Sequence, residues 1–265
     1  MKTINNITVI GTGNVALQFS KLFLKNKFKI DGIYGRSNFS DSQIDNHLYT
    51  DKVSNISKNS DLYLVAVSDD AYLELLKNIP LKNKFIVHTS GSLVSEMLNS
   101  FSKRWGCLYP LQTIKKNQLI EWDNIPFFIE ASNDNDLELL TNFCYANNLH
   151  YSVKNSAKRN KTHIAAVATN NFIYYLLSTI KEYCDKNKIN FKNLKPLLDQ
   201  SLNNVLNFPA HQLQTGPAIR KDLKLIEKHI ESLKSEKDLK EIYQLFSEKI
   251  IKKHHQEAVK MRILI

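Results

Sequence analysis

The chain has 265 residues, of which 43% are hydrophobic, so it can bury a large core and is long enough for two domains. Its formal net charge of +10 comes from 36 basic and 26 acidic residues, but the lysines are dispersed and do not alternate with aromatic residues, which argues against a nucleic-acid binder. The positive charge favours attraction of an anionic cofactor or substrate instead. The three cysteines are far apart in the sequence, so we expect neither a disulfide framework nor a metal site.

A glycine-rich turn directly follows the first apolar run of the chain, residues 7–10. The turn consists of Gly11, Thr12, Gly13, Asn14, Val15 and Ala16. A strand that turns at once into a helix needs a residue that tolerates a positive φ, and a diphosphate on backbone N–H groups needs a neighbour without a Cβ. Gly11 and Gly13 suit these roles, and the first N–H groups of a predicted helix at 15–25 stabilise phosphate charge. Such glycine pairs also occur in ordinary turns. In this context the turn predicts a dinucleotide site at residues 11–15.

The second predicted strand, residues 30–34, ends near side chains suited to the adenosine ribose. Arg36 and Ser37 follow it at the expected distance from the glycine turn. An acid there would accept from a free 2′-hydroxyl and favour NAD, whereas a guanidinium beside a hydroxyl suits a 2′-phosphate. We therefore predict NADP, with NAD as the less favoured alternative. In that alternative Arg36 is a solvated turn residue and Asp31 contacts the ribose, although Asp31 lies at the opposite end of the strand.

Further apolar runs predict a parallel sheet of six to eight strands with helices between them. Residues 61–67 and 85–88 are typical of strands buried on both faces, and more strands are expected at 106–109 and 126–129. His88 is interpreted as a buried histidine with satisfied hydrogen bonds. Because ligands bind at the carboxyl edge of such sheets, we expect the residues that end the first two runs to contact the cofactor. These residues are Val67, Ser68, Thr89, Ser90 and Gly91.

The character of the sequence changes after residue 153, and from residue 156 onward the signals are almost wholly helical. The predicted helices cover residues 156–184, 194–206, 222–233 and 237 to the end. We therefore predict an α/β fold, with an N-terminal doubly wound Rossmann domain over residues 1–154 and a C-terminal all-helical domain over residues 155–265. An apolar stripe on the last helix predicts a homodimer through the helical domain, although such stripes more often belong to a core.

The sequence predicts neither a secretory signal nor a membrane span. The glycine turn begins close to the first residue without a preceding apolar signal region. The longest apolar stretch, residues 164–180, is interrupted by polar residues at 169–171. We therefore expect a cytoplasmic protein that does not bind membranes.

The first predicted helix of the second domain supplies candidate catalytic residues. Hydride transfer to a carbonyl or imine carbon builds negative charge on the neighbouring heteroatom, so a proton donor or cationic group must lie beside it. His163 and Asn170 are two helical turns apart, which would place both in one cleft. His163 would act as general acid, and Asn170 or Asn171 would orient the substrate. Alternatively, His163 is a hydrogen-bonded structural histidine and the asparagines serve packing or the helix surface.

Six motifs together resemble the Rossmann-like oxidoreductases that carry a DUF2520 helical domain. The motifs comprise residues 11–16, 65–70, 88–92, 109–113, 163–171 and 215–222. That family is similar to the wider group of pyrroline-5-carboxylate reductase, the F420-dependent NADP reductases, and the 6-phosphogluconate and β-hydroxyacid dehydrogenases. The resemblance implies an NADP-binding Rossmann domain, a helical dimerising domain and a reductase or dehydrogenase. The helix that carries a Lys and an Asn one turn apart in β-hydroxyacid dehydrogenases has Lys161, His163 and Asn170-Asn171 here, so their catalytic acid is not transferred.

The favoured function is an NADP-dependent oxidoreductase that transfers a hydride between NADP(H) and a small carbonyl or imine substrate bound between the two domains. The alternative is a non-catalytic dinucleotide-binding sensor or partner-binding protein, which the lack of a clear catalytic lysine leaves open. A nucleic-acid binder is suggested by the charge alone and is not expected.

Overall fold

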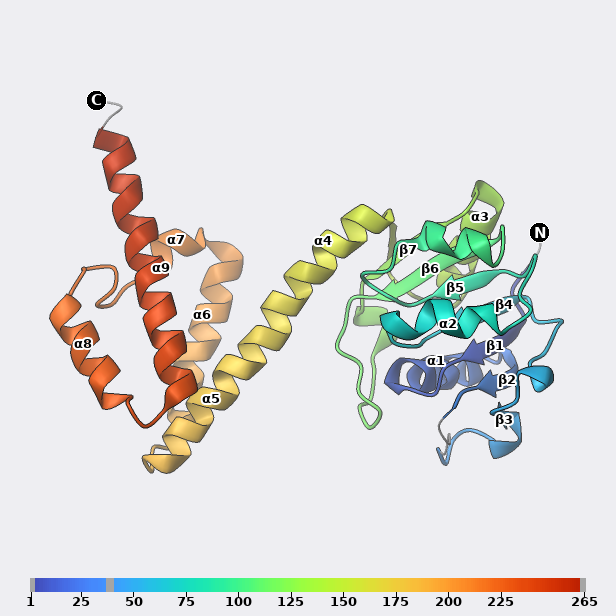
Figure 1. Cartoon of the computed structure of the whole chain (residues 1–265), viewed down its shortest axis with the longest axis horizontal. Coiled ribbons are helices and arrows are strands. Elements are labelled where there is room, and N and C mark those ends of the chain that lie inside the picture. Colours follow the sequence, from blue (N-terminus) through green and yellow to red (C-terminus); the bar gives the residue numbers. More distant parts are fainter. Residues whose placement is uncertain (1–2, 37–40, 263–265) are drawn as a thin grey trace. The chain divides into compact units, whose positions relative to one another are not determined.

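The computed structural model describes residues 3–36 and 41–262, with side chains described up to residue 255 except at 210 and 211. The chain divides into two compact units, Met1–Val167 and Ala168–Ile265 (Figure 1). The functional boundary predicted at residue 154 stays a prediction.

An eight-stranded sheet forms the centre of the first unit, in the order β3-β2-β1-β4-β5-β6-β7-β8. The strands are β1 (Asn6–Ile10), β2 (Lys29–Tyr34), β3 (Tyr49–Thr50), β4 (Leu62–Val65), β5 (Ile86–His88), β6 (Trp105–Pro110), β7 (Phe127–Ala131) and β8 (Tyr151–Val153). All neighbours are parallel except β6 and β7, which are antiparallel. The sequence predicts parallel strands throughout. Residues 111–126 connect β6 to β7 without an α-helix, and β7 runs back antiparallel beside β6.

Helices cover both faces of this sheet. The first unit contains α1 (Asn14–Lys25), α2 (Tyr72–Lys77), α3 (Asp134–Ala146) and α4 (Ser156–Val167). Phe19 of α1 and Phe143 of α3 belong to one buried apolar cluster, whereas Tyr72 and Leu76 of α2 belong to another. Alternate residues of the strands enter the two clusters, as the two-residue period of a strand requires. The predicted fold class, a doubly wound α/β domain followed by helices, is confirmed.

A buried ion pair attaches α4 to the sheet. The side chain of Arg159 is fully buried, and its Nη1 donates to Oε2 of Glu130 on β7 at 2.5 Å. Its Nη2 donates to the backbone oxygen of Leu93 and, at 3.1 Å in each case, to the hydroxyls of Ser95 and Ser156. The backbone N–H and the hydroxyl of Ser156 also donate to Glu130. The first turn of α4 is thereby joined both to β7 and to the segment after β5.

The described residues of the second unit are helical or form connections between helices. It begins with a π-helical segment, Ala168–Phe172, followed by α5 (Ile173–Lys186), α6 (Lys195–Asn207), α7 (Ala210–Leu213), α8 (Leu223–Ser232) and α9 (Lys237–Arg262). The single helix predicted for 156–184 is therefore α4, the π-helical segment and α5. The predictions for α6 and α8 are confirmed, and the prediction for α9 is confirmed up to residue 262, because residues 263–265 lie outside the described residues. The four-residue α7 was not predicted, because so short a helix leaves no periodic pattern in the sequence.

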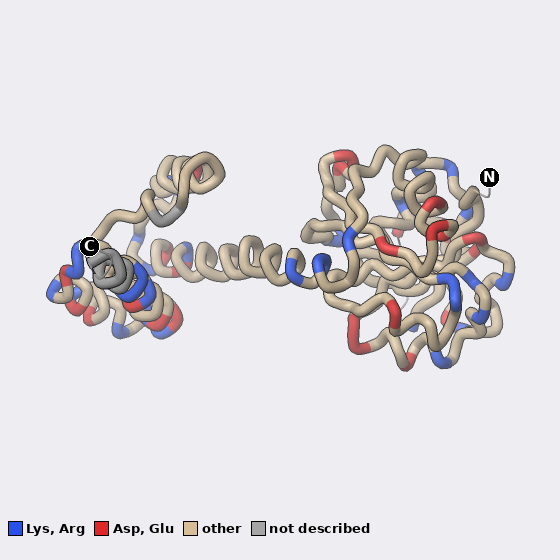
Figure 2. Tube along the Cα trace, turned by 90° about the horizontal axis from the view of Figure 1, so that it is seen from above, with Lys and Arg blue, Asp and Glu red and all other residues tan. Residues whose placement is uncertain are grey.

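Charged residues of both signs occur along both units. Figure 2 shows the Lys and Arg positions interspersed with Asp and Glu. Among the described residues, no helix combines the length and apolarity that a membrane span requires. The three cysteines, at 107, 144 and 184, are free and buried.

The Arg159–Glu130 pair predicts a large stability loss when one partner is removed. Glu130→Gln leaves the buried guanidinium uncompensated and should lower the free energy of unfolding by about 3–5 kcal/mol at neutral pH, as measured by urea denaturation. Lys181→Ala, which removes an exposed ion pair with Asp185, should change it by about 0.5 kcal/mol or less.

The effect of Glu130→Gln should depend on pH. Burial alone raises the pKa of Glu130, but hydrogen bonds from Arg159, Ser95 and Ser156 outweigh it and hold the pKa below the usual value of 4.5. This stabilisation is therefore complete above the pKa of the unfolded glutamate and is lost as the pH falls through the lower folded value. The difference in free energy of unfolding between wild type and Glu130→Gln should therefore become smaller below about pH 4. A difference that is the same at neutral pH and below pH 4 contradicts the assignment.

Candidate functional site

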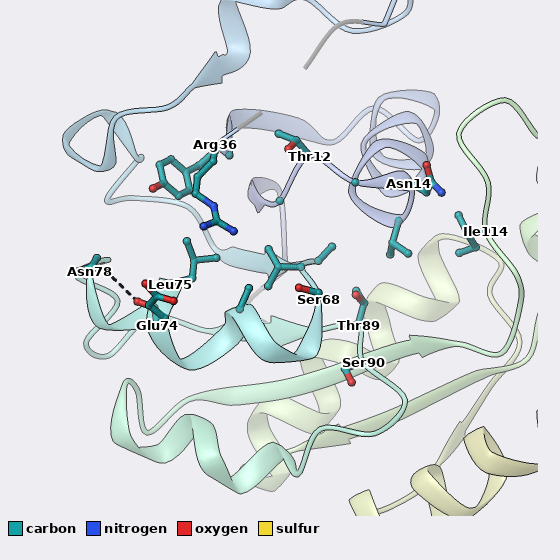
Figure 3. Close-up of a pocket in the computed structure, with 18 residues that line it drawn as sticks. Thr12, Asn14, Arg36, Ser68, Glu74, Leu75, Asn78, Thr89, Ser90 and Ile114 are labelled. Carbon is teal, nitrogen blue, oxygen red and sulfur yellow. Dashed lines mark hydrogen bonds between the residues drawn. The ribbon is translucent and has the colours of Figure 1, made fainter. Parts of the chain in front are cut away.

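A cavity of about 560 Å³ lies where β1, β2, β4 and β5 end, at the carboxyl edge of the sheet (Figure 3). The strand order reverses between β1 and β4, which is where open α/β sheets bind ligands. Every predicted cofactor residue except Ser37 and Gly91 lines this cavity. These lining residues are Gly11, Thr12, Gly13, Asn14, Val15, Arg36, Val67, Ser68, Thr89 and Ser90. Ser37 lies outside the described residues.

Gly11 is confined by the neighbouring strands. Its φ is +129°, and a Cβ built on it would lie 2.2 Å from the backbone oxygen of Ala66, just after β4. Its N–H donates to the backbone oxygen of Tyr34 at the end of β2, at 2.7 Å. Both the backbone conformation and the space therefore require glycine at this position.

Gly13 has a different reason to be glycine. It is the N-cap of α1 with φ at −79°, and no atom lies within 4 Å of a Cβ built there. No side chain caps this end of the helix. The first N–H groups of α1 therefore face the cavity beside bare main chain, an arrangement that suits a diphosphate.

One end of the cavity combines Arg36 with a face of α2. Figure 3 shows the guanidinium of Arg36 directed into the cavity toward Leu75 and Glu74. Among the described residues Arg36 has no ion-pair partner, so its charge is available to an anionic ligand. The contribution of α2 was not predicted from the sequence. Its lining residues have the i, i+3, i+4, i+7 spacing of one helix face, which was the available signal. They are Ala71, Glu74, Leu75 and Asn78.

The other end of the cavity contains Thr89, Ser90 and Ile114 (Figure 3). Ile114, also missed from sequence, belongs to the irregular connection between β6 and β7. Gln18 of α1 holds this connection, because its Nε2 lies 2.9 Å from each of three backbone oxygens. The oxygens belong to Lys115, Lys116 and Gln118.

His88 supports the segment that carries Ser90. Its Nε2 lies 2.8 Å from the hydroxyl of Ser95, and its Nδ1 accepts from the backbone N–H of Ser90 at 3.2 Å. Burial, and secondly the charge of Arg159, hold the pKa of His88 well below the usual 6.5. His88 is therefore neutral, and its interpretation as a buried, satisfied histidine is confirmed.

His163 lies beside Gly91, the residue that follows Ser90 of the cavity lining. Its Nδ1 is 2.9 Å from the hydroxyl oxygen of Tyr109, and the two rings meet edge to face. A Cβ on Gly91 would lie 2.6 Å from this Nδ1. His163 is four residues after the buried Arg159, so both lie on the α4 face that packs against the rest of the first unit. The predicted general acid thus lies next to a predicted cofactor residue, although neither lines the cavity.

Asn170 and Asn171 lie in the π-helical segment of the second unit, where Asn170 is half-buried and Asn171 exposed. Asn170 and His163 would share one face only if the helix between them were a regular α-helix. A π-helical turn contains more residues than an α-helical turn, so it shifts the direction of every following side chain. The predicted role of both asparagines stays a prediction.

Three residues around His163 were missed from sequence. Tyr109 ends the predicted strand 106–109, where it is read as an ordinary core position, and Glu130 directly follows the predicted strand 126–129. Arg159 lies among exposed lysines, and charged residues are almost never fully buried unless paired. The available signal was Glu130 itself, a carboxylate directly after an apolar run.

Residues 125–250 match the family model described as "Domain of unknown function (DUF2520)". A protein from Bacteroides fragilis described as a "putative NADP oxidoreductase" is 29% identical, with a TM-score of 0.82 over 94% of this chain and 98% of that chain. The predicted resemblance is confirmed. The cavity precedes the DUF2520 match in the sequence, so the match itself covers only the later part of the first unit and most of the second.

Two further solved structures share the fold at low identity. Pyrroline carboxylate reductase from Plasmodium falciparum, with NADP bound, is 14% identical, with a TM-score of 0.57 over 94% of this chain and 100% of that chain. Reductive aminase from Aspergillus terreus, in complex with NADPH and ethyl levulinate, is 13% identical, with a TM-score of 0.68 over 98% of this chain and 95% of that chain. No curated protein sequence matches the chain significantly.

The two glycines of the turn predict opposite consequences for alanine. Gly11→Ala forces a Cβ into the Ala66 carbonyl and should lower the free energy of unfolding by more than about 1–3 kcal/mol. The methyl group of Gly13→Ala contacts no other atom, so the free energy of unfolding should stay within about 1 kcal/mol of wild type. Because this methyl group projects from the cavity wall, it should weaken dinucleotide binding. Thermal denaturation and calorimetric titration separate the two effects. A stable Gly11→Ala protein, or unchanged binding in Gly13→Ala, contradicts this assignment.

Proposed function

We propose that the protein is an NADP-dependent oxidoreductase that acts on a small carbonyl or imine compound. The observation that carries the proposal is the cavity at the reversal of strand order, which combines bare main chain, an uncapped helix end and Arg36. Support comes from the likeness to the Bacteroides fragilis protein, which extends over nearly the whole of both chains.

The residues present fit NADP. The diphosphate would rest on the N–H groups at the start of α1, where Gly13 leaves room. Arg36 would bind the 2′-phosphate, because it lies at the end of β2 without an ion-pair partner among the described residues. The nicotinamide would then lie toward Thr89 and Ser90 at the other end of the cavity. When bound, NADPH supplies a hydride to the acceptor carbon of the substrate.

His163 is the proposed proton donor. The tight contact with Gly91 keeps its ring beside the segment that ends the cavity. A proton or hydrogen bond from its ring would stabilise charge on the acceptor heteroatom. Asn170 or Asn171 would orient the substrate, and the placement of the substrate between the two domains stays a sequence-based prediction.

The homodimer and the cytoplasmic location also remain proposals. Support for the dimer comes from α6, where Leu198, Leu202 and Val205 lie on one helix face and are exposed, Leu202 to 62%. Sedimentation equilibrium tests it: a monomer mass at micromolar concentration contradicts the dimer.

Calorimetric titration tests the cofactor. NADPH should bind more tightly than NADH, and Arg36→Ala should weaken NADPH by about 1–3 kcal/mol while leaving NADH nearly unchanged. Arg220→Ala, with the same change in net charge in the second unit, should bind NADPH as wild type does. Equal losses for both cofactors in Arg36→Ala reject the role of Arg36, and no binding of either cofactor rejects the proposed function.

Turnover tests the chemistry. NADPH oxidation should be detected across a panel of keto acids, aldehydes, ketones and imines, and His163→Ala should lower kcat by about 10²–10⁴-fold with little change in NADPH affinity. A variant with unchanged kcat places the proton donor elsewhere. Tight NADPH binding with no turnover of any compound would favour the alternative of a dinucleotide sensor.

A further inference from the structure

The hydroxyl of Tyr109 is hydrogen-bonded to one of the two ring nitrogens of His163. Their separation of 2.9 Å at Nδ1 is that of a hydrogen bond. Among the described residues no partner is present at Nε2 of His163. Nε2 is therefore the ring nitrogen left to interact with a bound molecule.

The direction of this hydrogen bond follows from what each group can satisfy. Among the described residues the Tyr109 hydroxyl has only His163 as a hydrogen-bond partner. If Nδ1 carried the proton and donated, the phenolic proton of a tyrosine that is only 8% exposed would have no acceptor. If the phenol donates to Nδ1, both the phenolic proton and Nδ1 are paired, and the proton of the neutral imidazole is on Nε2, where a bound molecule can accept it.

The surrounding structure holds this pair in place. Tyr109 is on β6, and its ring packs against Phe128 of β7 with the ring centroids 6.1 Å apart. His163 is one helical turn after Arg159, whose buried bonds anchor α4, and its Nδ1 edge contacts Gly91. The ring therefore has little freedom to flip and exchange its two nitrogens.

We infer that Tyr109 is a positioning residue that keeps neutral His163 in the tautomer with the proton on Nε2, and that the site takes substrates whose reacting heteroatom carries a lone pair. The second part rests on the proposed function. A donating Nε2–H needs an acceptor, which a ketone or aldehyde oxygen or a neutral imine nitrogen provides. A quaternary iminium ion has no such lone pair.

Tyr109 holds the ring and is not itself the proton source. Neutral His163 stabilises the charge on the reacting heteroatom through a hydrogen bond from Nε2–H, and the proton that completes the product comes from solvent water. Burial raises the pKa of Tyr109 to about 12, so the phenol keeps its proton at neutral pH. Passing that proton to Nδ1 would leave a phenolate in this buried position, which burial opposes.

Nitrogen-detected NMR of the full chain labelled with ¹⁵N-histidine tests the tautomer directly, at about pH 8.5. We expect the His163 signals, assigned by their loss in His163→Gln, to show the proton on Nε2. In Tyr109→Phe, which keeps the ring and removes only the hydroxyl, they should shift toward a mixture of tautomers. Wild-type signals with the proton on Nδ1, or no change in Tyr109→Phe, overturn the role of Tyr109.

The chain offers a matched control for the loss of a tyrosine hydroxyl. The hydroxyl of Tyr243 on α9 makes the same contact with Nδ1 of His229 on α8, at 2.7 Å. Tyr243→Phe should alter the His229 signals and leave those of His163 unchanged. If Tyr243→Phe moves the His163 signals as much as Tyr109→Phe does, the effect is not local and the inference fails.

The substrate class is tested by turnover of a cyclic ketone against an N-methyl iminium ion of matched ring size. We expect kcat/KM for the ketone to exceed that for the iminium by about tenfold or more, because only the ketone accepts from Nε2–H. Equal or faster turnover of the iminium overturns the inferred class. If neither compound nor any other panel member is turned over, the proposed function fails, while the NMR result still decides the role of Tyr109.

Discussion

The close approach of Gly11 to the main chain after β4 is the constraint on which the candidate site depends. With 2.2 Å between a built Cβ and the Ala66 oxygen, β1 can turn directly into α1 only through a residue without a side chain. That turn places the uncapped start of α1 over the carboxyl edge of the sheet. The ends of β2, β4 and β5 then bring Arg36, Ser68 and Thr89 around the same cavity (Figure 3). A backbone requirement thus creates the place where an anionic ligand can rest.

A second constraint positions His163, the proposed proton donor. The buried Arg159–Glu130 pair attaches the first turn of α4 to β7, and Arg159 also binds the segment after β5. His88 belongs to the same network through Ser95 and also accepts from the N–H of Ser90, which lines the cavity. One polar cluster therefore supports both the wall of the cavity and the helix that carries His163. Because a buried charge is costly when unpaired, this cluster has little tolerance for altered geometry.

The sequence predicts the features that arise from local patterns. The glycine turn, the apolar runs and the helical periods predicted most strands, the doubly wound class and most of the cavity lining. What it missed depends on contacts between distant segments: Glu74 enters the cavity only because α2 packs beside β4, and Arg159 finds its carboxylate 29 residues earlier in the chain. The π-helical segment at 168–172 was missed because a helix with one such turn keeps the composition of a regular helix.

The central claim is that the diphosphate of NADP rests on the main chain of residues 11–15. A crystal structure of the protein grown with NADP⁺ tests it most directly. The account predicts difference density for the diphosphate against the N–H groups at the start of α1, with the 2′-phosphate at Arg36. Density for the cofactor at any other place on the protein would contradict the claim.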